Sequence, residues 1–210
     1  MSVSNALYLA LADDAFYIQL EEKIIASGRD GREGMLRYYD YSIRAAEATG
    51  KLVLPADQGD WGAALWSLPP QSTDNESTSA VFENTKAQSS SINLHDKATY
   101  FVEHLGELAY EHYQAVCDSM AKLTEPHIKY SDWYLSIIGI APEYQSRGLG
   151  KQLLSPVLDE ADDAGVSTYL ETFVPRNMRF YERYGFKIIT ELYEPVLDTH
   201  YHLLRRPVGG

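Results

Sequence analysis

Apolar side chains recur at the spacing of an amphipathic helix over three long segments of the chain. We expect helices over about 5–26, about 33–48 and 97–123, because apolar positions there return every three to four residues. Asn5 is expected to cap the first helix, and the glycine-rich stretch 27–31 to end it. All three predicted helices therefore end before residue 124.

Between and after these helices, short apolar runs predict β-strands. Residues 51–55 and 61–66 indicate a hairpin, since two apolar runs flank a polar turn that contains glycine. Residues 134–140 form a longer apolar run that indicates a buried strand, and the Ala-Pro-Glu sequence after it favours a turn. Closing strands are expected at 187–189 and 199–203. The pattern predicts an α/β (α+β) fold in which a mixed, mostly antiparallel twisted sheet is flanked by helices.

Strand alternation predicts on which face of the hairpin each of its two tryptophans lies. Side chains alternate across a strand, so Trp61 and Trp66 should lie on opposite faces unless Gly62 introduces a bulge. In the alternating arrangement, one of the two indole rings would be able to reach an active-site cleft.

A polar passage rich in Ser, Thr, Asn and Gln runs from about 69 to 96. It is too poor in apolar residues to predict a strand, so we expect a long loop there, with a short helix near 81–86 as its candidate element. The chain has 210 residues and a mass of 23.7 kDa, which suits a single domain over 1–210 with this loop inside it.

The chain is acidic, with a formal net charge of -12 and a pI near 4.9. Such a charge disfavours non-specific binding to nucleic acid or to an anionic membrane and favours cationic acceptors, although an acidic surface also serves solubility alone. The first residues lack the basic and apolar regions of a signal peptide, and no apolar run is long enough to cross a bilayer. We therefore expect a cytoplasmic protein that binds neither nucleic acid nor membranes.

Cysteine and histidine give no sign of metal chemistry. Cys117 is the only cysteine, which excludes an intrachain disulfide and a zinc site made of cysteine pairs, and we expect it to pack within a helix. His127, His200 and His202 lack a metal-ligand spacing joined to carboxylates. We expect surface or structural roles for these histidines, and no bound metal.

A glycine loop lies between the strand 134–140 and the helix expected after it. Its residues are Gln145, Ser146, Arg147, Gly148, Leu149, Gly150 and Lys151. Glycine lets the backbone approach a phosphate closely, and the N–H groups of the first helical turn then face the anion. Arg147 and Lys151 would add long-range attraction. On spacing alone, an anion site and an ordinary strand-to-helix turn are equally good interpretations.

After this loop, apolar positions from Leu149 to Ala161 predict a helix that ends at Gly165. Pro156 falls two turns into this helix, where a missing N–H costs roughly 3 kcal/mol. The apolar stripe continues past the proline, so we predict one bent helix rather than two.

The loop and the sequence that follows it together resemble the GNAT superfamily of acetyl-CoA-dependent N-acetyltransferases. The resemblance rests on the loop 145–151, the stretch Tyr169–Asn177 and the run Phe180–Phe186, in this order. It implies a GNAT-like fold, acyltransferase activity, and acetyl-CoA as co-substrate. It also implies that the loop residues hold the cofactor pyrophosphate, that Asn177 contacts the pantetheine arm and that Tyr181 faces the CoA sulfur.

The same resemblance implies how the acetyl group is held. The pantetheine would run alongside Gly139 and Ile140 like an added strand, and a backbone N–H near Ile138 would stabilise the oxyanion. Tyr181 is the candidate general acid, because a phenol of pKa about 10 can give its proton to a departing thiolate. A buried core tyrosine is the plainer interpretation of this residue.

Glu171 is the candidate general base, which the reaction needs because an alkylamine is only about one part in a thousand neutral at pH 7. It lies near the place where the superfamily sheet splays to admit the cofactor. A strand glutamate could instead hold a backbone group or an arginine. Tyr134 occupies a position where some superfamily members carry a glutamate base, which leaves the proton path open.

Within the superfamily, the C-terminal part of the chain resembles the puromycin N-acetyltransferase branch. The phrases that carry this resemblance are Trp133–Leu135, Gly139–Glu143, Tyr169–Thr172, Pro175–Asn177 and Phe180–Arg183. It implies that the acceptor is the primary amine of a small molecule, which attacks the thioester directly. The N-terminal half resembles the branch only loosely, so the amine itself is not identified.

Other interpretations stay open beside this one. The acidic charge also suits a protein or peptide acceptor, either a lysine or an N-terminus, and a non-catalytic acetyl-CoA sensor would keep the same loop. In the superfamily the first two helices border the acceptor site. Tyr38, Tyr39 and Tyr41 are therefore candidates for substrate contact, although core packing is the plainer role for each. The assembly state is open, with a homodimer among the alternatives.

Overall fold

The computed structural model describes residues 2–69 and 97–210. The predicted polar loop over 69–96 and its candidate helix at 81–86 therefore lie outside the described residues, apart from residue 69. Within the described residues, six strands form one sheet in the order β1-β2-β3-β4-β6-β5. The strands are β1 Lys51–Val53, β2 Gly62–Ser67, β3 Trp133–Ile140, β4 Thr168–Thr172, β5 Lys187–Glu194 and β6 Thr199–Arg206.

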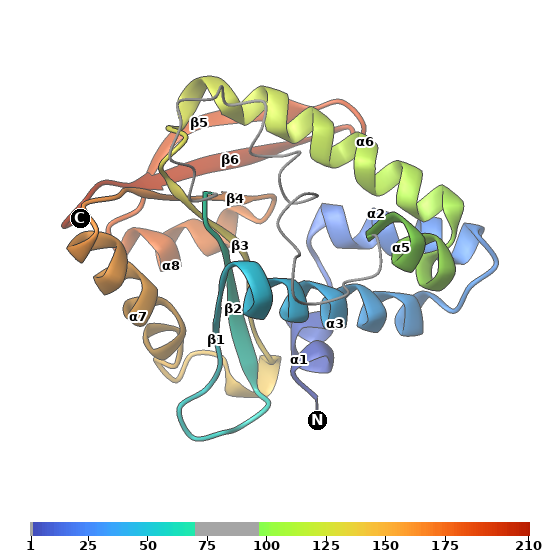
Figure 1. The fold of residues 1–210 in the computed structure, drawn as a ribbon, viewed down its shortest axis with the longest axis horizontal. Helices are drawn as coiled ribbons and strands as arrows, with labels where there is room; N and C mark the ends of the chain where they lie inside the picture. The colour runs from blue at the N-terminus through green and yellow to red at the C-terminus, as the bar shows by residue number, and fades with distance from the viewer. Residues whose placement is uncertain (1, 70–96) are drawn as a thin grey trace.

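Helices cover both faces of this sheet (Figure 1). One face carries α1 Val3–Ala10, α2 Ala15–Ala26, α3 Gly31–Thr49, α5 Lys97–Leu105 and α6 Glu107–Thr124. The other face carries α7 Gly150–Asp163 and α8 Met178–Glu182. Short 3₁₀ turns are η1 Glu125–His127, η2 Pro142–Tyr144 and η3 Pro175–Asn177. All neighbouring strands are antiparallel except β3 and β4, so the predicted fold class is confirmed.

The two helical layers bury separate apolar clusters against the sheet. The cluster under α1, α2, α3 and α5 is rich in tyrosine and includes Tyr38, Tyr39 and Tyr41. Their exposed fractions are 6%, 0% and 8%, so these rings belong mainly to the core. This packing matches the plainer of the two roles predicted for them.

The first predicted helix is two helices. Its first part ends at Ala10, and Asp14 starts α2 by accepting a hydrogen bond of 3.0 Å from the backbone N–H of Phe16. An aspartate stabilises a helix start in this way because the first N–H groups have no partner inside the helix. The predicted cap is also wrong: Ser2 caps α1, and its hydroxyl accepts from the backbone N–H of Asn5.

The helix predicted over 97–123 is also broken, at Gly106. This residue has a φ of 93°, a conformation that glycine adopts easily. A Cβ at Gly106 would lie 2.3 Å from the Cβ of Ser27, so the connection between α5 and α6 passes the end of α2 at a distance that only glycine allows. The apolar spacing continues across Gly106, so the sequence pattern did not reveal the break.

The later elements follow the predictions more closely. α7 is one helix that contains Pro156, and it ends at Asp163, two residues before the predicted end. Its apolar stripe is buried and consists of Leu153, Leu154, Val157, Leu158 and Ala161. The closing strands β5 and β6 exist where they were predicted and are longer than the apolar runs that indicated them.

The prediction that Trp61 and Trp66 lie on opposite faces is wrong, because both indole rings belong to the cluster under α7. Trp61 precedes β2, in a connection where its Nε1 donates to the carboxylate of Asp57 at 3.1 Å, so strand alternation does not govern it. The register irregularity of this sheet region falls between Leu65 and Trp66 instead of at the predicted glycine.

Candidate functional site

Strands β3 and β4 part from each other after a short parallel stretch. The ladder joins Trp133–Leu135 to Thr168–Leu170 and the described pairing stops there. β3 then continues to Ile140, paired with β2 on its other edge. We call the parted edges Ser136–Ile140 and Glu171–Thr172 the β3–β4 split. Main-chain polar groups need partners, so an extended ligand could pair with these edges as a strand would.

Glu171 is the first residue of β4 beyond the ladder, and hydroxyl groups hold both oxygens of its carboxylate. Tyr134 donates a hydrogen bond of 2.9 Å to Oε2, and Thr124 at the end of α6 donates to Oε1. The Thr124 hydroxyl also lies 3.0 Å from the hydroxyl of Tyr201. Burial raises the pKa of Glu171, and the two hydrogen bonds offset part of this effect. The carboxylate therefore holds a proton more tightly than an exposed glutamate, as a general base requires.

Tyr134 is thus in direct contact with the candidate base, which the sequence did not predict. Its ring stacks on that of Tyr169, its neighbour across the parallel ladder, with ring centroids 4.7 Å apart. Burial, together with the charge of Glu171, raises the pKa of Tyr134, so the phenol keeps its proton. It can therefore donate to the carboxylate at any ordinary pH.

Tyr181 lies in α8, in the cluster on the opposite face of the sheet from the Glu171 contacts. Only 7% of the residue is exposed, and its ring contacts those of Phe180 and Phe186. Within the described residues its hydroxyl forms no hydrogen bond. Burial raises the pKa of Tyr181, and the charge of Asp14 adds to the effect. The phenol therefore stays protonated and can act as a donor.

The glycine loop leads from η2 into α7 with two residues in the left-handed conformation. Ser146 has a φ of 60° and Gly148 a φ of 76°. Left-handed residues within a turn direct successive N–H groups to one side and create an anion-binding concavity. Leu149 precedes α7 and provides no side-chain cap, but the N–H groups of Lys151 and Gln152 already donate to the carbonyls of Gly148 and Leu149 at 3.3 and 3.0 Å. An anion at this helix start would therefore be bound mainly by main-chain N–H groups of the loop before Lys151.

Two side chains of the loop donate to main-chain carbonyls just before it. Gln145 donates from Nε2 to the carbonyl of Ile140 at 2.9 Å. Arg147 donates from Nη2 to the carbonyl of Glu143 at 2.6 Å, and its guanidinium lies over the ring of Tyr144. These contacts fix the shape of the loop, a role that the sequence analysis did not assign to either side chain.

The two glycines of the loop have different reasons to be glycine. A Cβ at Gly148 would meet nothing within 4 Å, so its left-handed conformation is the constraint. Gly150 is buried, and a Cβ there would lie 2.4 Å from the ring of Phe180. Gly150 thus makes room for the Phe180 ring, and its role in letting the backbone approach a phosphate stays a prediction. Lys151 beside it is exposed and keeps its predicted ability to attract an anion.

The remaining predicted cofactor residues lie along the split and after it. Ile138, Gly139 and Ile140 form the end of β3, beyond the ladder to β4. α1 crosses close to this strand, since a Cβ at Gly139 would lie 2.9 Å from the side chain of Leu7. Asn177 ends η3 and is half-buried directly before α8.

Sequence reasoning missed one carboxylate near these groups, that of Asp14. Burial raises its pKa to about 6. The neighbouring Asp13 forms an ion pair with Arg176 in η3, which joins the α1–α2 turn to the segment that carries Asn177. An aspartate after a polar turn is a helix-start signal, and it went unused because one continuous helix was predicted here.

The histidines considered as metal ligands and the single cysteine are spread over η1, β6 and α6. His127 and His200 are exposed, and Nε2 of His202 lies 3.6 Å from a carboxylate oxygen of Glu191. Cys117 is half-buried in α6, where burial raises the pKa of its thiol and keeps it protonated. In the described part of the chain, no three His, Cys, Asp or Glu side chains gather to hold a metal ion. Over the same part, no helix is both long and apolar enough to span a membrane.

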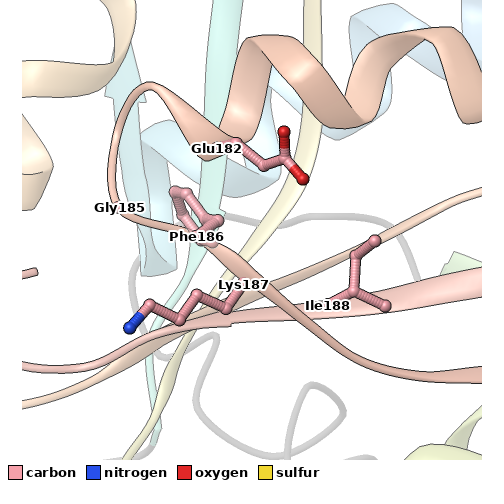
Figure 2. A pocket seen from close by; sticks show the side chains of 5 residues that line it. All are labelled: Glu182, Gly185, Phe186, Lys187 and Ile188. Atoms are coloured by element: carbon pink, nitrogen blue, oxygen red, sulfur yellow. The ribbon is translucent and has the colours of Figure 1, made fainter.

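A surface pocket lies at the turn from α8 into β5 (Figure 2). Its lining residues are Glu182, Gly185, Phe186, Lys187 and Ile188. The carboxylate of Glu182 and the ammonium of Lys187 point away from each other in Figure 2, so the pocket gathers no convergent polar groups. None of the predicted catalytic or cofactor residues lines it.

Comparisons with known proteins point to one family. Residues 112–186 match the model of the acetyltransferase (GNAT) family, a stretch that contains the split, the glycine loop, Glu171 and Tyr181. An uncharacterised N-acetyltransferase of Schizosaccharomyces pombe is 31% identical over 61 residues, which cover 29% of this chain and 25% of that protein. The chain thus spans about a quarter of the length of this curated relative.

Solved structures extend the similarity to the whole fold. A crystal structure described as histone acetyltransferase HPA2 and related acetyltransferase, from Corynebacterium glutamicum, gives a TM-score of 0.62 at 17% identity, covering 98% of this chain and 89% of that one. Naa20 of Chaetomium thermophilum gives a TM-score of 0.45 at 14% identity, with 83% and 73% covered. The Corynebacterium structure shows that the chain shares the fold of that acetyltransferase, and residues 112–186 resemble the GNAT acetyltransferase family.

Proposed function

We propose that this chain is an acetyl-CoA-dependent N-acetyltransferase that moves an acetyl group to the primary amine of a small molecule by direct attack on the thioester. One observation carries the proposal: β3 leads from the β3–β4 split to the glycine loop, and the side chains of Glu171 and Tyr181 lie on opposite faces of the sheet. The family match supports acetyl transfer as the class of reaction.

The residues proposed to hold acetyl-CoA are of two kinds. The loop Gln145–Lys151 offers main-chain N–H groups and two cations to the pyrophosphate. The edge Ile138–Ile140 offers main-chain groups to the pantetheine amides, in the way that an added strand is bound, and Asn177 offers its side-chain amide. A backbone N–H near Ile138 is the proposed donor to the oxyanion.

Glu171 is proposed as the general base, acting through Tyr134. The amine first loses its ammonium proton to solvent. The neutral nitrogen then forms a bond to the acetyl carbon while one of its protons passes to the Tyr134 oxygen, and the proton of Tyr134 passes to Glu171. The carbon–sulfur bond breaks, and Tyr181 gives its proton to the sulfur. Solvent then restores the proton of Tyr181 and removes that of Glu171. The raised pKa of Glu171 supports this role, since it narrows the difference between the pKa of the base and that of the amine.

A small amine is favoured over a peptide by the motifs that resemble the puromycin N-acetyltransferase branch. The close approach of α1 to β3 at Gly139 also supports a compact acceptor site. A peptide acetyltransferase and a non-catalytic sensor are the alternatives. We further propose that residues 1–210 act as one domain, in the cytoplasm and without a bound metal.

The test is thiol release from acetyl-CoA with a panel of aminonucleosides, polyamines, amino sugars, arylalkylamines and a basic peptide. Turnover of a small amine that falls strongly in Tyr181→Phe would support the proposal. Turnover of the peptide alone would replace it with protein acetylation. Tight binding of acetyl-CoA without turnover of any member would identify a sensor.

A further inference from the structure

Two hydroxyl groups that the proposed mechanism does not use, those of Thr124 and Tyr201, meet at the Glu171 carboxylate. Glu171 pairs with Leu203 across β4 and β6, and Tyr201 lies two residues from Leu203 on the same face of the sheet. α6 ends at Thr124 beside this face. Thr124 donates to Oε1 of Glu171, and its oxygen lies 3.0 Å from the hydroxyl oxygen of Tyr201.

The direction of these hydrogen bonds follows from the number of protons. An ionised carboxylate only accepts, so Thr124 gives its single hydroxyl proton to Glu171. The contact between Thr124 and Tyr201 then needs the phenol as donor. Burial raises the pKa of Tyr201, so the phenol keeps its proton at neutral pH and can donate it. We call this ordered series, Tyr201 to Thr124 to Glu171, the hydroxyl chain.

Thr124 uses its hydroxyl differently from two other hydroxyl side chains in helices. Ser42 and Thr49 in α3 donate to carbonyls of their own helix four residues back, at 2.9 and 3.0 Å, which is a common local bond. Thr124 reaches instead to a carboxylate 47 positions away in the sequence. Thr124 and Tyr201 are both 0% exposed, so water does not compete for these bonds.

No cation balances the charge of this carboxylate. In the described ranges 2–69 and 97–210, no lysine, arginine or histidine forms an ion pair with Glu171. Burial disfavours the charged form, so hydrogen-bond donors have to stabilise it. The titratable groups that contact the carboxylate or feel its charge are neutral at pH 7, because burial raises the pKa of each: Tyr134 on β3, Tyr169 on β4, Cys117 on α6 and Tyr201 on β6.

We propose that Thr124 and Tyr201 are positioning residues for the reaction, and that their hydroxyl chain keeps the Glu171 carboxylate ionised and oriented with Oε2 toward Tyr134. Tyr201 polarises the Thr124 hydroxyl by donating to it, which strengthens the bond from Thr124 to Oε1. The inference rests on the proposed function, in which Glu171 is the base. It makes the end of α6 a part of the catalytic apparatus.

The test removes the hydroxyl groups one at a time. Thr124→Val removes the hydroxyl with little change of shape, Thr124→Ser keeps it, and Tyr201→Phe removes the first donor of the chain. The matched control is Thr49→Val, the same change at the exposed end of α3. The measurement is an NMR titration of the full chain carrying ¹³C at the glutamate carboxyl carbons. The Glu171 signal is identified by its loss in Glu171→Gln, and the other signals show that a variant is folded.

We expect the midpoint of the Glu171 titration to lie about one pH unit higher in Thr124→Val than in the wild type, because a hydrogen bond to the charged form is lost. Tyr201→Phe should move the midpoint in the same direction by less. Thr124→Ser and Thr49→Val should keep it. An unchanged midpoint in Thr124→Val or in Tyr201→Phe would overturn the inference, and so would an equal rise in Thr124→Ser. Should Thr124→Val fail to fold, Tyr201→Phe decides.

Thiol release by the same variants separates this inference from the proposed function. With an accepted amine, the fall of kcat on acidification should begin about one pH unit higher in Thr124→Val, with the KM for acetyl-CoA unchanged. A titration midpoint that moves in a chain without thiol release from any amine would remove the proposed reaction and leave the hydroxyl chain. Turnover with an unmoved midpoint would remove the hydroxyl chain and leave acetyl transfer.

Discussion

The hydroxyl of Tyr134 donates a hydrogen bond of 2.9 Å to Oε2 of Glu171, across the point where β3 and β4 separate. A phenol hydrogen-bonded to a carboxylate can take up a proton on its oxygen and pass its own on, so the pair forms a short path for a proton that leaves an amine. The two residues are 37 positions apart in the sequence, and only the parallel register brings them together.

Glu171→Gln should lower kcat about a hundredfold, because the proposed final proton acceptor is lost. Tyr134→Phe should lower it about tenfold, because it removes only the proposed link between amine and base. The measurement is steady-state thiol release at saturating amine. Glu191→Gln, an exposed change on β5, serves as control and should keep wild-type kcat. A Glu171→Gln enzyme as fast as the wild type would exclude Glu171 as the base.

The pH dependence of kcat should reflect the ionisation of Glu171. Its pKa is raised by burial, so on acidification the carboxylate takes up its proton at a higher pH than an exposed glutamate does. kcat should therefore begin to fall at a higher pH than the usual glutamate range, and Glu171→Gln should show no such fall. Profiles of both proteins from pH 4.5 to 9 test this, and an identical acid limb in the variant would contradict it.

Tyr181→Phe should reduce kcat about tenfold to a hundredfold while leaving acetyl-CoA binding nearly unchanged. The lost hydroxyl forms no hydrogen bond within the described residues, so the fold should tolerate its removal. Tyr184→Phe is the control, since Tyr184 contacts the same Phe180 ring and has no proposed catalytic role. Equal losses in the two variants would indicate a packing effect rather than proton donation.

The loop glycines should respond differently to alanine. Gly150→Ala should destabilise the fold by about 1–3 kcal/mol, because its Cβ would meet the Phe180 ring at 2.4 Å. Adding Phe180→Leu should recover part of this loss. Gly148→Ala should cost about 1–2 kcal/mol through its left-handed backbone, with no recovery from Phe180→Leu. Urea unfolding of the two single and the two double variants measures these losses of stability. Recovery of stability by Phe180→Leu in both the Gly150→Ala and the Gly148→Ala protein would contradict the distinction.

Asp162 and Arg206 should make the fold sensitive to acid. Two hydrogen bonds of 2.7 Å join their side chains and tie the end of α7 to β6. The Arg206 hydrogen bonds lower the pKa of Asp162 from 3.8 to about 2, so its stabilising effect is present above pH 3.8 and is lost as the pH falls toward 2.

Asp162→Asn should therefore be less stable than the wild type at pH 6, by about 1–2 kcal/mol for a partly exposed pair. The difference should shrink toward pH 2.5. Thermal unfolding of both proteins at several pH values tests this expectation. A difference that stays constant with pH would assign the loss to packing instead of charge.

The parts of the fold set by local pattern could be predicted from the sequence. β3 is a continuous apolar run, and α7 follows a glycine loop with a regular apolar stripe, so both were predicted where they lie. The loop residues, Glu171 and Tyr181 were candidates because their order along the chain resembles that of a known superfamily. The structure adds where they lie relative to the parted strands.

Features set by distant contacts could not be predicted. The break at Gly106 depends on the passage of Ser27 beside it, and neither residue changes the apolar spacing of its own helix. The contact of Tyr134 with Glu171 depends on the register of two strands. The burial of Asp14 depends on tertiary packing, which its sequence neighbourhood does not reveal.

The short ladder between β3 and β4 also bears on mechanics. Main-chain pairing joins β1, β2 and β3 to β4, β6 and β5 only from Trp133 to Leu135, so the sheet resembles two ribbons held by a narrow seam. A ligand that pairs with the free edges would lengthen that seam. Bound acetyl-CoA would then stiffen the joint between the two halves of the sheet as well as react. Amide hydrogens of Ser136–Ile140 should therefore exchange more slowly when it is bound.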